Sequence, residues 1–120
     1  MNRKELIREY KERRPTMGVY RVSTTVTGES LVAASRDVNS LLNRHRAQLR
    51  TGAHPSKTLQ AAWNAHGPDS FTFEVLDVLE PAEDPARDPT SDLAALEDMW
   101  LDRLGLSPDR IHTILRKPLP

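Results

Sequence analysis

Hydrophobic positions divide the chain into short segments with two different periods. From Met17 to Thr25 β-branched and aromatic residues are dense, Thr27-Gly28 follows as a turn, and Leu31 to Ala34 is a second apolar run. In residues 70–79, Phe71, Phe73 and Val75 alternate with polar side chains, and Leu76, Val78 and Leu79 continue the run. Alternation and β-branched content of this kind are typical of strands, so the pattern predicts a β-hairpin and a third strand.

Helical spacing marks the segments between and around these strands. Residues 2–14 have a helical pattern that stops at Pro15, and a second helix is expected to end at Gly52. The apolar stripe of that second helix consists of Val38, Leu41, Leu42, His45 and Leu49. A third helix is expected from about Pro55 to His66, and a last one over residues 93–104.

The resulting order, α-β-β-α-α-β-α, predicts an α+β fold with a small, three-stranded, mainly antiparallel sheet flanked by helices. We expect one domain over residues 16–115, with residues 1–15 as an extra N-terminal helix. One core is expected to hold it together. Its predicted members are Leu41, Leu42, Trp63, Phe71, Phe73, Leu96 and Trp100.

Composition narrows the classes of protein that this chain can belong to. At 120 residues it has the size of one ordinary domain, and it contains no cysteine. Disulfide frameworks, thiolate nucleophiles and zinc-thiolate sites are therefore excluded. The sequence shows no apolar run long enough to span a bilayer and no secretory signal near its start, so we expect a cytoplasmic protein with no membrane partner.

Charge is distributed unevenly although the formal net charge is zero. Residues 1–57 carry twelve Lys and Arg against five Asp and Glu, whereas residues 58–120 carry five against twelve. This asymmetry is compatible with a phosphate-facing surface in the first half and a cation-binding or DNA-repelling second half. Charge pairing between the two halves is the alternative, and composition alone leaves both open.

Several short motifs occur in an order that resembles one known family. They are Gly18-Val19-Tyr20, the Thr27-Gly28 turn, Ser35, Arg44-His45, Leu59-Gln60, Trp63-Asn64, His66-Gly67, Phe71 to Leu76, and Glu97 with Trp100. Over about residues 17 to 112 the chain is similar to the GIY-YIG nuclease family. The resemblance implies that family's small sheet with flanking helices and a nuclease-type site.

The resemblance implies roles for Tyr20 and Glu97. The tyrosine of the first family motif helps to activate the attacking water, and the family's glutamate binds a divalent metal. Magnesium, or manganese, suits such a site because it accepts one carboxylate together with water and substrate phosphate. Independently of the family, Glu97 borders the apolar stripe of its helix, where a carboxylate must be paired or bound. A boundary glutamate paired with Arg103 is the alternative reading.

The chain departs from the family at the glycine of the second motif, where it has Ala33, and at two positions that bear more directly on catalysis. Leu31 stands where the second tyrosine is expected, and Leu41 stands where the catalytic arginine is expected. Leucine cannot contact a phosphate electrostatically, so cleavage is predicted to be weak or lost. Arg36 and Arg44 are candidates to replace the arginine, and His112 falls near the position of a late family asparagine.

Histidines supply further candidates for the site. His45 and His54 fall where some members of the family carry histidines that assist binding or proton transfer, so His45 joins Tyr20 and Glu97 as a predicted catalytic residue. The structural alternative is that His45 completes the inner face of its helix and that His54 caps the next one. His66 lies at a helix end, and no chemistry is assigned to it.

Basic residues on and after the second helix are the predicted contacts to DNA phosphates. They are Arg36, Arg44, Arg46, Arg50, His54 and Lys57. The chain is therefore predicted to be a DNA-binding or DNA-processing relative of a metal-dependent endonuclease. The alternative is a protein-interaction module that recruits a protein partner through the N-terminal helix or the acidic second half.

Overall fold

A three-stranded antiparallel sheet forms the centre of the molecule. The computed structural model describes residues 2–3, 15–84 and 86–106. Strands β1 (Gly18–Thr24), β2 (Ser30–Ser35) and β3 (Phe71–Val78) lie in the order β2-β1-β3, and both neighbouring pairs are antiparallel. The predicted hairpin and third strand are confirmed, and the expected turn residue Gly28 has a left-handed φ of 74°.

Three α-helices and a short 3-10 turn complete the described fold. They are α2 (Val38–Thr51), α3 (Lys57–His66), η1 (Pro68–Ser70) and α4 (Thr90–Leu104). Helix α3 begins two residues later than Pro55 because the Ser56 side chain accepts a hydrogen bond from the backbone N–H of Leu59 and so caps the helix. The predicted order of elements is otherwise confirmed from β1 to α4.

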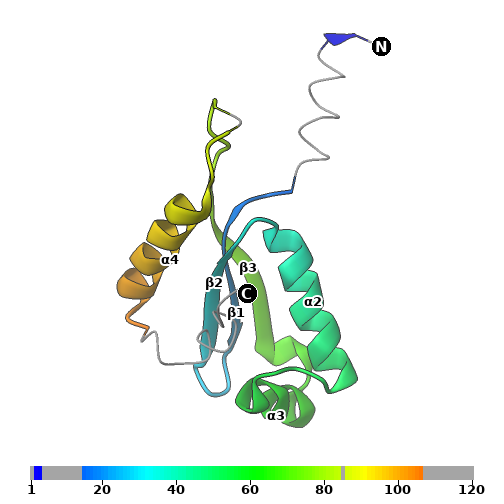
Figure 1. The fold of residues 1–120 in the computed structure, drawn as a ribbon. Coiled ribbons are helices and arrows are strands. Elements are labelled where there is room, and N and C mark those ends of the chain that lie inside the picture. Colours follow the sequence, from blue (N-terminus) through cyan, green and yellow to red (C-terminus); the bar gives the residue numbers. More distant parts are fainter. Residues whose placement is uncertain (1, 4–14, 85, 107–120) are drawn as a thin grey trace.

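The helices cover both faces of the sheet. Figure 1 shows α4 on one side of the strands, and α2 and α3 on the other. The predicted single core is therefore two clusters, separated by the sheet. One cluster lies under α2 and α3 and includes Tyr20, Leu31 and Leu49. The other cluster lies under α4 and is centred on Val19, Val32 and Leu101. This correction follows from the alternation of side chains along each strand.

Strand β1 approaches β3 so closely that it needs a glycine at its start. A Cβ atom added to Gly18 would collide with the backbone carbonyl oxygen of Asp77. The register between the two strands shifts by one residue between Val19 and Tyr20. Regular alternation along β1 places Tyr20, with Val22, on the face that α2 covers, and Val19 on the opposite face.

Some predictions concern residues outside the described part of the chain. The N-terminal helix over residues 1–15 and the position of His112 lie there, and the domain boundaries at 16 and 115 stay predictions. Among the described residues, no helix is long and apolar enough to cross a bilayer.

Candidate active site

Three aromatic side chains form a hydrogen-bonded chain beneath helix α2. The Tyr20 hydroxyl lies 2.9 Å from Nε2 of His45, and Nδ1 of His45 lies 3.0 Å from Nε2 of His54. All three residues are buried, with exposed fractions of 1%, 1% and 6%. The structure thus brings together Tyr20 and His45, two of the predicted catalytic residues, and adds His54. We call these three residues the relay.

Backbone geometry determines which nitrogens of the relay carry protons. The backbone N–H of Ser56 donates to Nδ1 of His54 at 3.0 Å, so neutral His54 carries its proton on Nε2. That proton is donated to Nδ1 of His45, which leaves the His45 proton on Nε2, facing Tyr20. The Tyr20 oxygen is then an acceptor, and its own O–H is available to donate elsewhere.

A single glutamine holds the loop that carries His54. Gln60 Oε1 accepts from the backbone N–H of His54 at 3.1 Å, while its Nε2 donates to the carbonyl of Leu49 and to Oδ1 of Asn64. Gly52 ends α2 in a left-handed conformation, which turns the chain back toward α3. The loop between the two helices therefore has one defined position, and His54 is aimed at His45.

Burial keeps the relay neutral. It lowers the pKa of His45 to about 4, with smaller contributions from His54 and from the positive charge of Arg44. The pKa of His54 is also lowered by burial. The pKa of Tyr20 is raised by burial and then by the negative charge of Glu97, while Arg44 acts in the opposite direction. At neutral pH the relay is a phenol with two neutral imidazoles.

Glu97 approaches this site from the opposite layer. It lies on α4, is only 7% exposed, and its Oε2 accepts from the backbone N–H of Ala34 at 3.2 Å. Since β2 is an edge strand, this bond satisfies a half-buried amide that has no neighbouring strand on that side. The prediction that Glu97 borders the apolar stripe agrees with this burial, and its charge reaches Tyr20.

The two leucines that replace family residues are packed as core residues. Leu31 is fully buried in the cluster under α2, opposite Val22 in the sheet register, and Leu41 is half-buried against the same cluster. Neither position offers a polar group to a substrate. Arg44, one residue before His45 and exposed on α2, is a cation whose charge acts on both Tyr20 and His45.

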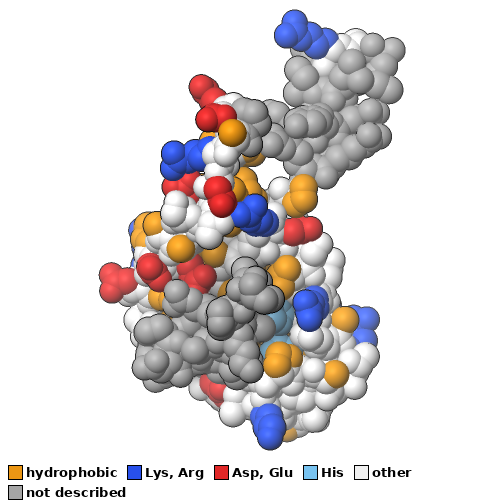
Figure 2. All heavy atoms as spheres, viewed as in Figure 1, with side chains coloured by type: hydrophobic (Ala, Val, Ile, Leu, Met, Phe, Trp, Pro, Cys, Tyr) orange, Lys and Arg blue, Asp and Glu red, His pale blue; other side chains and the backbone are white. Residues whose placement is uncertain are grey.

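The predicted DNA-binding residues divide into three environments. Arg44, Arg46 and Arg50 lie on α2, and Lys57 is exposed at the start of α3. Arg36 instead forms an ion pair of 2.7 Å with Asp88 and also donates to the Thr90 hydroxyl. Figure 2 shows basic side chains over α2 and α3, acidic side chains over α4, and side chains of both signs over the loop before it.

Of the predicted DNA-binding residues, His54 is the one that the structure does not place at the surface. Its ring is buried and bonded to His45, so a backbone phosphate cannot reach it in this conformation. The alternative of a helix cap is also replaced, because Ser56 caps α3. The physical reason is the tight turn after Gly52, which directs the ring inward.

The donor set limits the kind of metal that the site suits. Among the described residues, no group of three or more His, Asp or Glu side chains is arranged to hold an ion. Glu97 is the carboxylate beside the relay, and its Oε2 already accepts from Ala34. One hard oxygen ligand fits a largely hydrated Mg²⁺, which depends on substrate phosphate for further ligands, and does not fit a closed structural site.

Two features of the site were not predicted from the sequence. Ser56 and Gln60 orient His54, although the Leu59-Gln60 pair was recognised only as part of the family resemblance. The Ser-Lys-Thr-Leu stretch at residues 56–59 contained the signal, because a serine before a helical run is a typical N-cap. The position of Gln60 had no such signal, since its three partners lie on different elements.

Comparisons with known proteins identify the fold. No family model matches the sequence, and no curated protein matches it. One similar solved structure is a mutant form of the catalytic domain of intron endonuclease I-TevI, with a TM-score of 0.57 and 22% identity over 75% of this chain and 84% of that one. Another is the catalytic domain of homing endonuclease I-TevI, with a TM-score of 0.55 and 25% identity over 74% of this chain and 88% of that one. The described part of the chain therefore has a GIY-YIG-like α+β fold.

Proposed function

We propose that this protein binds DNA with a nuclease-type site whose phosphodiester cleavage is weak or lost. The observation that carries the proposal is the buried Tyr20–His45–His54 relay on a GIY-YIG-like scaffold. A purely structural core has little need for three polar rings, because apolar side chains fill the same space without hydrogen-bond requirements.

The relay prepares Tyr20 to orient an oxygen atom. His45 Nε2–H donates to the phenol, so the Tyr20 O–H is directed to a further acceptor, which we assign as the attacking water or a phosphate oxygen. Because the pKa of Tyr20 is raised, the phenol keeps its proton at neutral pH. Removing this proton requires that the negative charge on the phenol be stabilised, and the His45 donor is placed to do so.

Glu97 is the residue that we assign to a divalent metal. GIY-YIG nucleases typically depend on such an ion, and Mg²⁺ or Mn²⁺ at Glu97 would neutralise charge on the phosphate and stabilise the leaving oxygen. The Ala34 N–H holds the Glu97 carboxylate in one orientation. The protein thus contributes a carboxylate that is already oriented before a metal binds.

Leu31 and Leu41 are the reason for the expected loss of activity. Removing one electrostatic contact to a developing charge costs about two to three orders of magnitude in rate. Both leucines are packed into the core, so neither is free to rearrange into a polar role. Arg44 is the cation that we assign to partial compensation, because its charge acts on both Tyr20 and His45.

The experiment is cleavage of supercoiled and branched DNA by purified protein with Mg²⁺ or Mn²⁺. Wild type is compared with Glu97→Ala, with the loop variant Glu83→Ala as a matched control, and with Leu41→Arg. We expect wild type and Glu83→Ala to nick DNA slowly or not at all, and Glu97→Ala not to nick it. Leu41→Arg is expected to nick DNA at least about tenfold faster than wild type. Leu41→Met controls for changes in packing at this half-buried position.

Two outcomes contradict the proposal. Rapid wild-type cleavage shows that the leucines do not limit the chemistry. Absence of DNA binding by wild type in low salt removes the DNA function altogether. The second outcome favours the protein-interaction module, which is then sought through the acidic half of the chain.

A further inference from the structure

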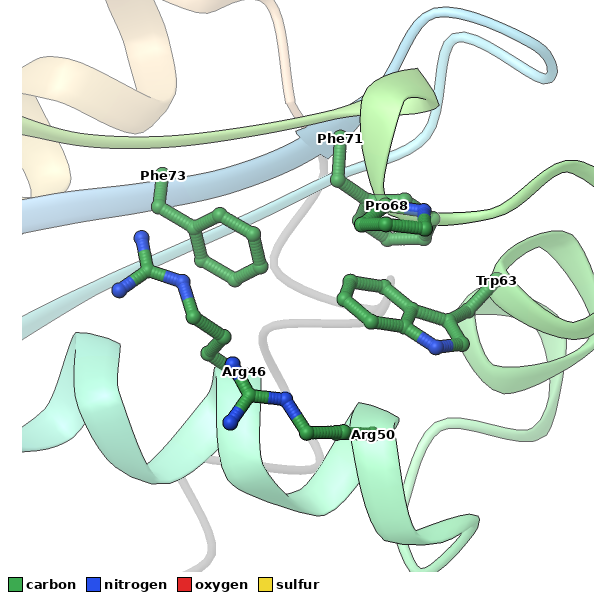
Figure 3. A pocket seen from close by; sticks show the side chains of 6 residues that line it. All are labelled: Arg46, Arg50, Trp63, Pro68, Phe71 and Phe73. Carbon is green, nitrogen blue, oxygen red and sulfur yellow. The ribbon is translucent and has the colours of Figure 1, made fainter.

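Beside the relay lies an open pocket with aromatic walls and two cations. Its volume is about 530 Å³, within the range of small-molecule sites, and α2, α3, η1 and β3 contribute its lining. Figure 3 shows the side chains that line it. They are Arg46, Arg50, Trp63, Pro68, Phe71 and Phe73. We call this the aromatic pocket.

The rings form a continuous apolar wall. Trp63 and Phe71 meet edge to face with centroids 5.4 Å apart, and Phe71 stacks near Phe73 at 6.3 Å. Only Phe71 of the three is buried, while Trp63 and Phe73 are half-buried. A wall that the fold leaves partly open provides faces on which a flat ligand can stack.

The cations of the pocket have no carboxylate partner among the described residues. The Arg46 guanidinium lies over the Phe73 ring, with Cζ 4.5 Å from the centroid, and Arg50 lies one helical turn further along α2. No ion pair of the described residues involves either arginine, and none of the described lining residues is acidic. The pocket therefore favours an anion attached to a flat ring.

The aromatic pocket and the relay lie on the same face of the sheet. Arg46 directly follows His45 on α2. In the sheet register, Tyr20 pairs with Val75 and Val22 pairs with Phe73, so Phe73 is about 7 Å along β3 from the residue opposite Tyr20. This offset is comparable to the step from one nucleotide to the next.

We propose that the aromatic pocket binds one unpaired nucleobase, adjacent to the nucleotide whose phosphate faces Tyr20, with Arg50 and Arg46 on the flanking phosphates. The inference rests on the proposed DNA-binding function and adds the substrate class: DNA with a single-stranded or frayed segment at the site. A base inside a duplex has both faces covered by its neighbours, whereas an unpaired base has a free face to stack on Trp63.

The test compares three probes that differ only in what they offer the pocket. They are a twelve-nucleotide dT strand, an abasic strand with the same number of phosphates, and a duplex of the same length. Binding is measured by anisotropy of an end label and by quenching of tryptophan fluorescence. The dT strand is expected to bind about tenfold tighter than the abasic strand and to quench the emission.

Variants assign the effect to the pocket. Trp63→Leu is expected to reduce dT affinity to that of the abasic strand without changing duplex affinity, while Trp63→Phe keeps dT affinity and loses the quench. Arg50→Gln is expected to weaken binding of both strands. Arg103→Gln is its matched control, because Arg103 stacks on the other tryptophan, Trp100, on the opposite face of the sheet.

The outcomes separate failure of this inference from failure of the proposed function. Equal binding of the dT and abasic strands by wild type overturns the nucleobase pocket and leaves phosphate binding intact. If no probe binds at low salt, both proposals fail. A dimer in sedimentation that Trp63→Leu converts to a monomer assigns the pocket to a second copy of the chain, and also overturns the inference. The wild-type comparison stands even if Trp63→Leu does not fold.

Discussion

At the scale of single residues, the chemistry of this protein depends on how neutral side chains are held. His54 is oriented by two backbone contacts, from Ser56 to its ring and from its own N–H to Gln60, and it in turn orients His45. Each of the N–H donors that link Ser56, His54, His45 and Tyr20 has one acceptor, so the protons of the relay have a single arrangement. The hydrogen bond from His45 to Tyr20 therefore has a direction that the backbone N–H of Ser56 sets through His54.

The neutral state of His45 predicts a pH dependence of stability. Its pKa is lowered from 6.5 to about 4 in the folded protein, so the unfolded chain binds the proton more tightly. Stability from neutral burial is complete above pH 6.5 and is lost as the pH falls from 6.5 toward 4. The free energy of unfolding is expected to decrease by about 3 kcal/mol across this window.

Chemical denaturation at half-unit pH steps measures this effect. His45→Gln is expected to reduce the slope between pH 6.5 and 4, because His54 then remains as the buried imidazole of the relay whose pKa is lowered. His66→Gln is the matched control, since His66 is exposed at the end of α3 and its removal leaves the slope unchanged. Equal slopes for wild type and His45→Gln would contradict the assigned protonation state.

At the scale of elements, the approach of strands and helices decides which side chains meet. Trp100 of α4 donates from its indole Nε1 to Oδ2 of Asp77 at 2.9 Å, and thereby joins the α4 layer to β3. The backbone of the same Asp77 passes over Gly18. The start of β1 is therefore enclosed between β3 and the elements around it, which leaves little freedom for Tyr20 to move.

Gly18→Ala is expected to destabilise the fold through this close contact. The added Cβ collides with the Asp77 carbonyl, and separating β1 from β3 is expected to cost about 2 kcal/mol in the free energy of unfolding. Gly28→Ala serves as the comparison, because Gly28 has open space around it and only a left-handed φ to lose, worth about 1 kcal/mol. Thermal and urea unfolding measure both. Full stability of Gly18→Ala would show that the strands separate without strain.

At the scale of the whole molecule, the charge asymmetry becomes a difference between faces. The α2 surface carries arginines without carboxylate partners among the described residues, whereas Arg36 and Arg87 pair with Asp88 and Asp92 around the loop before α4. Arg36 with Asp88 is a pair between the two halves of the chain, whereas Arg87 with Asp92 is a pair within the second half. Pairing offsets the charges of Asp88 and Asp92 beside that loop, and the α2 surface remains basic (Figure 2).

The basic α2 surface predicts a steep salt dependence of DNA affinity. Each phosphate contact contributes a slope of about −0.9 in a plot of log affinity against log salt concentration. The triple variant Arg44→Gln, Arg46→Gln and Arg50→Gln is expected to reduce the magnitude of the slope by roughly 2 to 3. Duplex titrations from low to moderate salt measure it, with Arg103→Gln as control. A triple variant with the wild-type slope would place the DNA elsewhere.

The local pattern of the sequence determined the elements, because strand alternation, helical stripes and turn glycines are properties of neighbouring residues. It also singled out Tyr20, His45 and Glu97, through their places in those elements and through the family resemblance. Tertiary structure alone decided what these residues contact. The division of the core by the sheet, the inward turn of His54, the Arg36–Asp88 ion pair and the aromatic pocket all join residues from separate elements. Side-chain spacing along one element carries no information about the distance to another, so only the packed fold could determine these contacts.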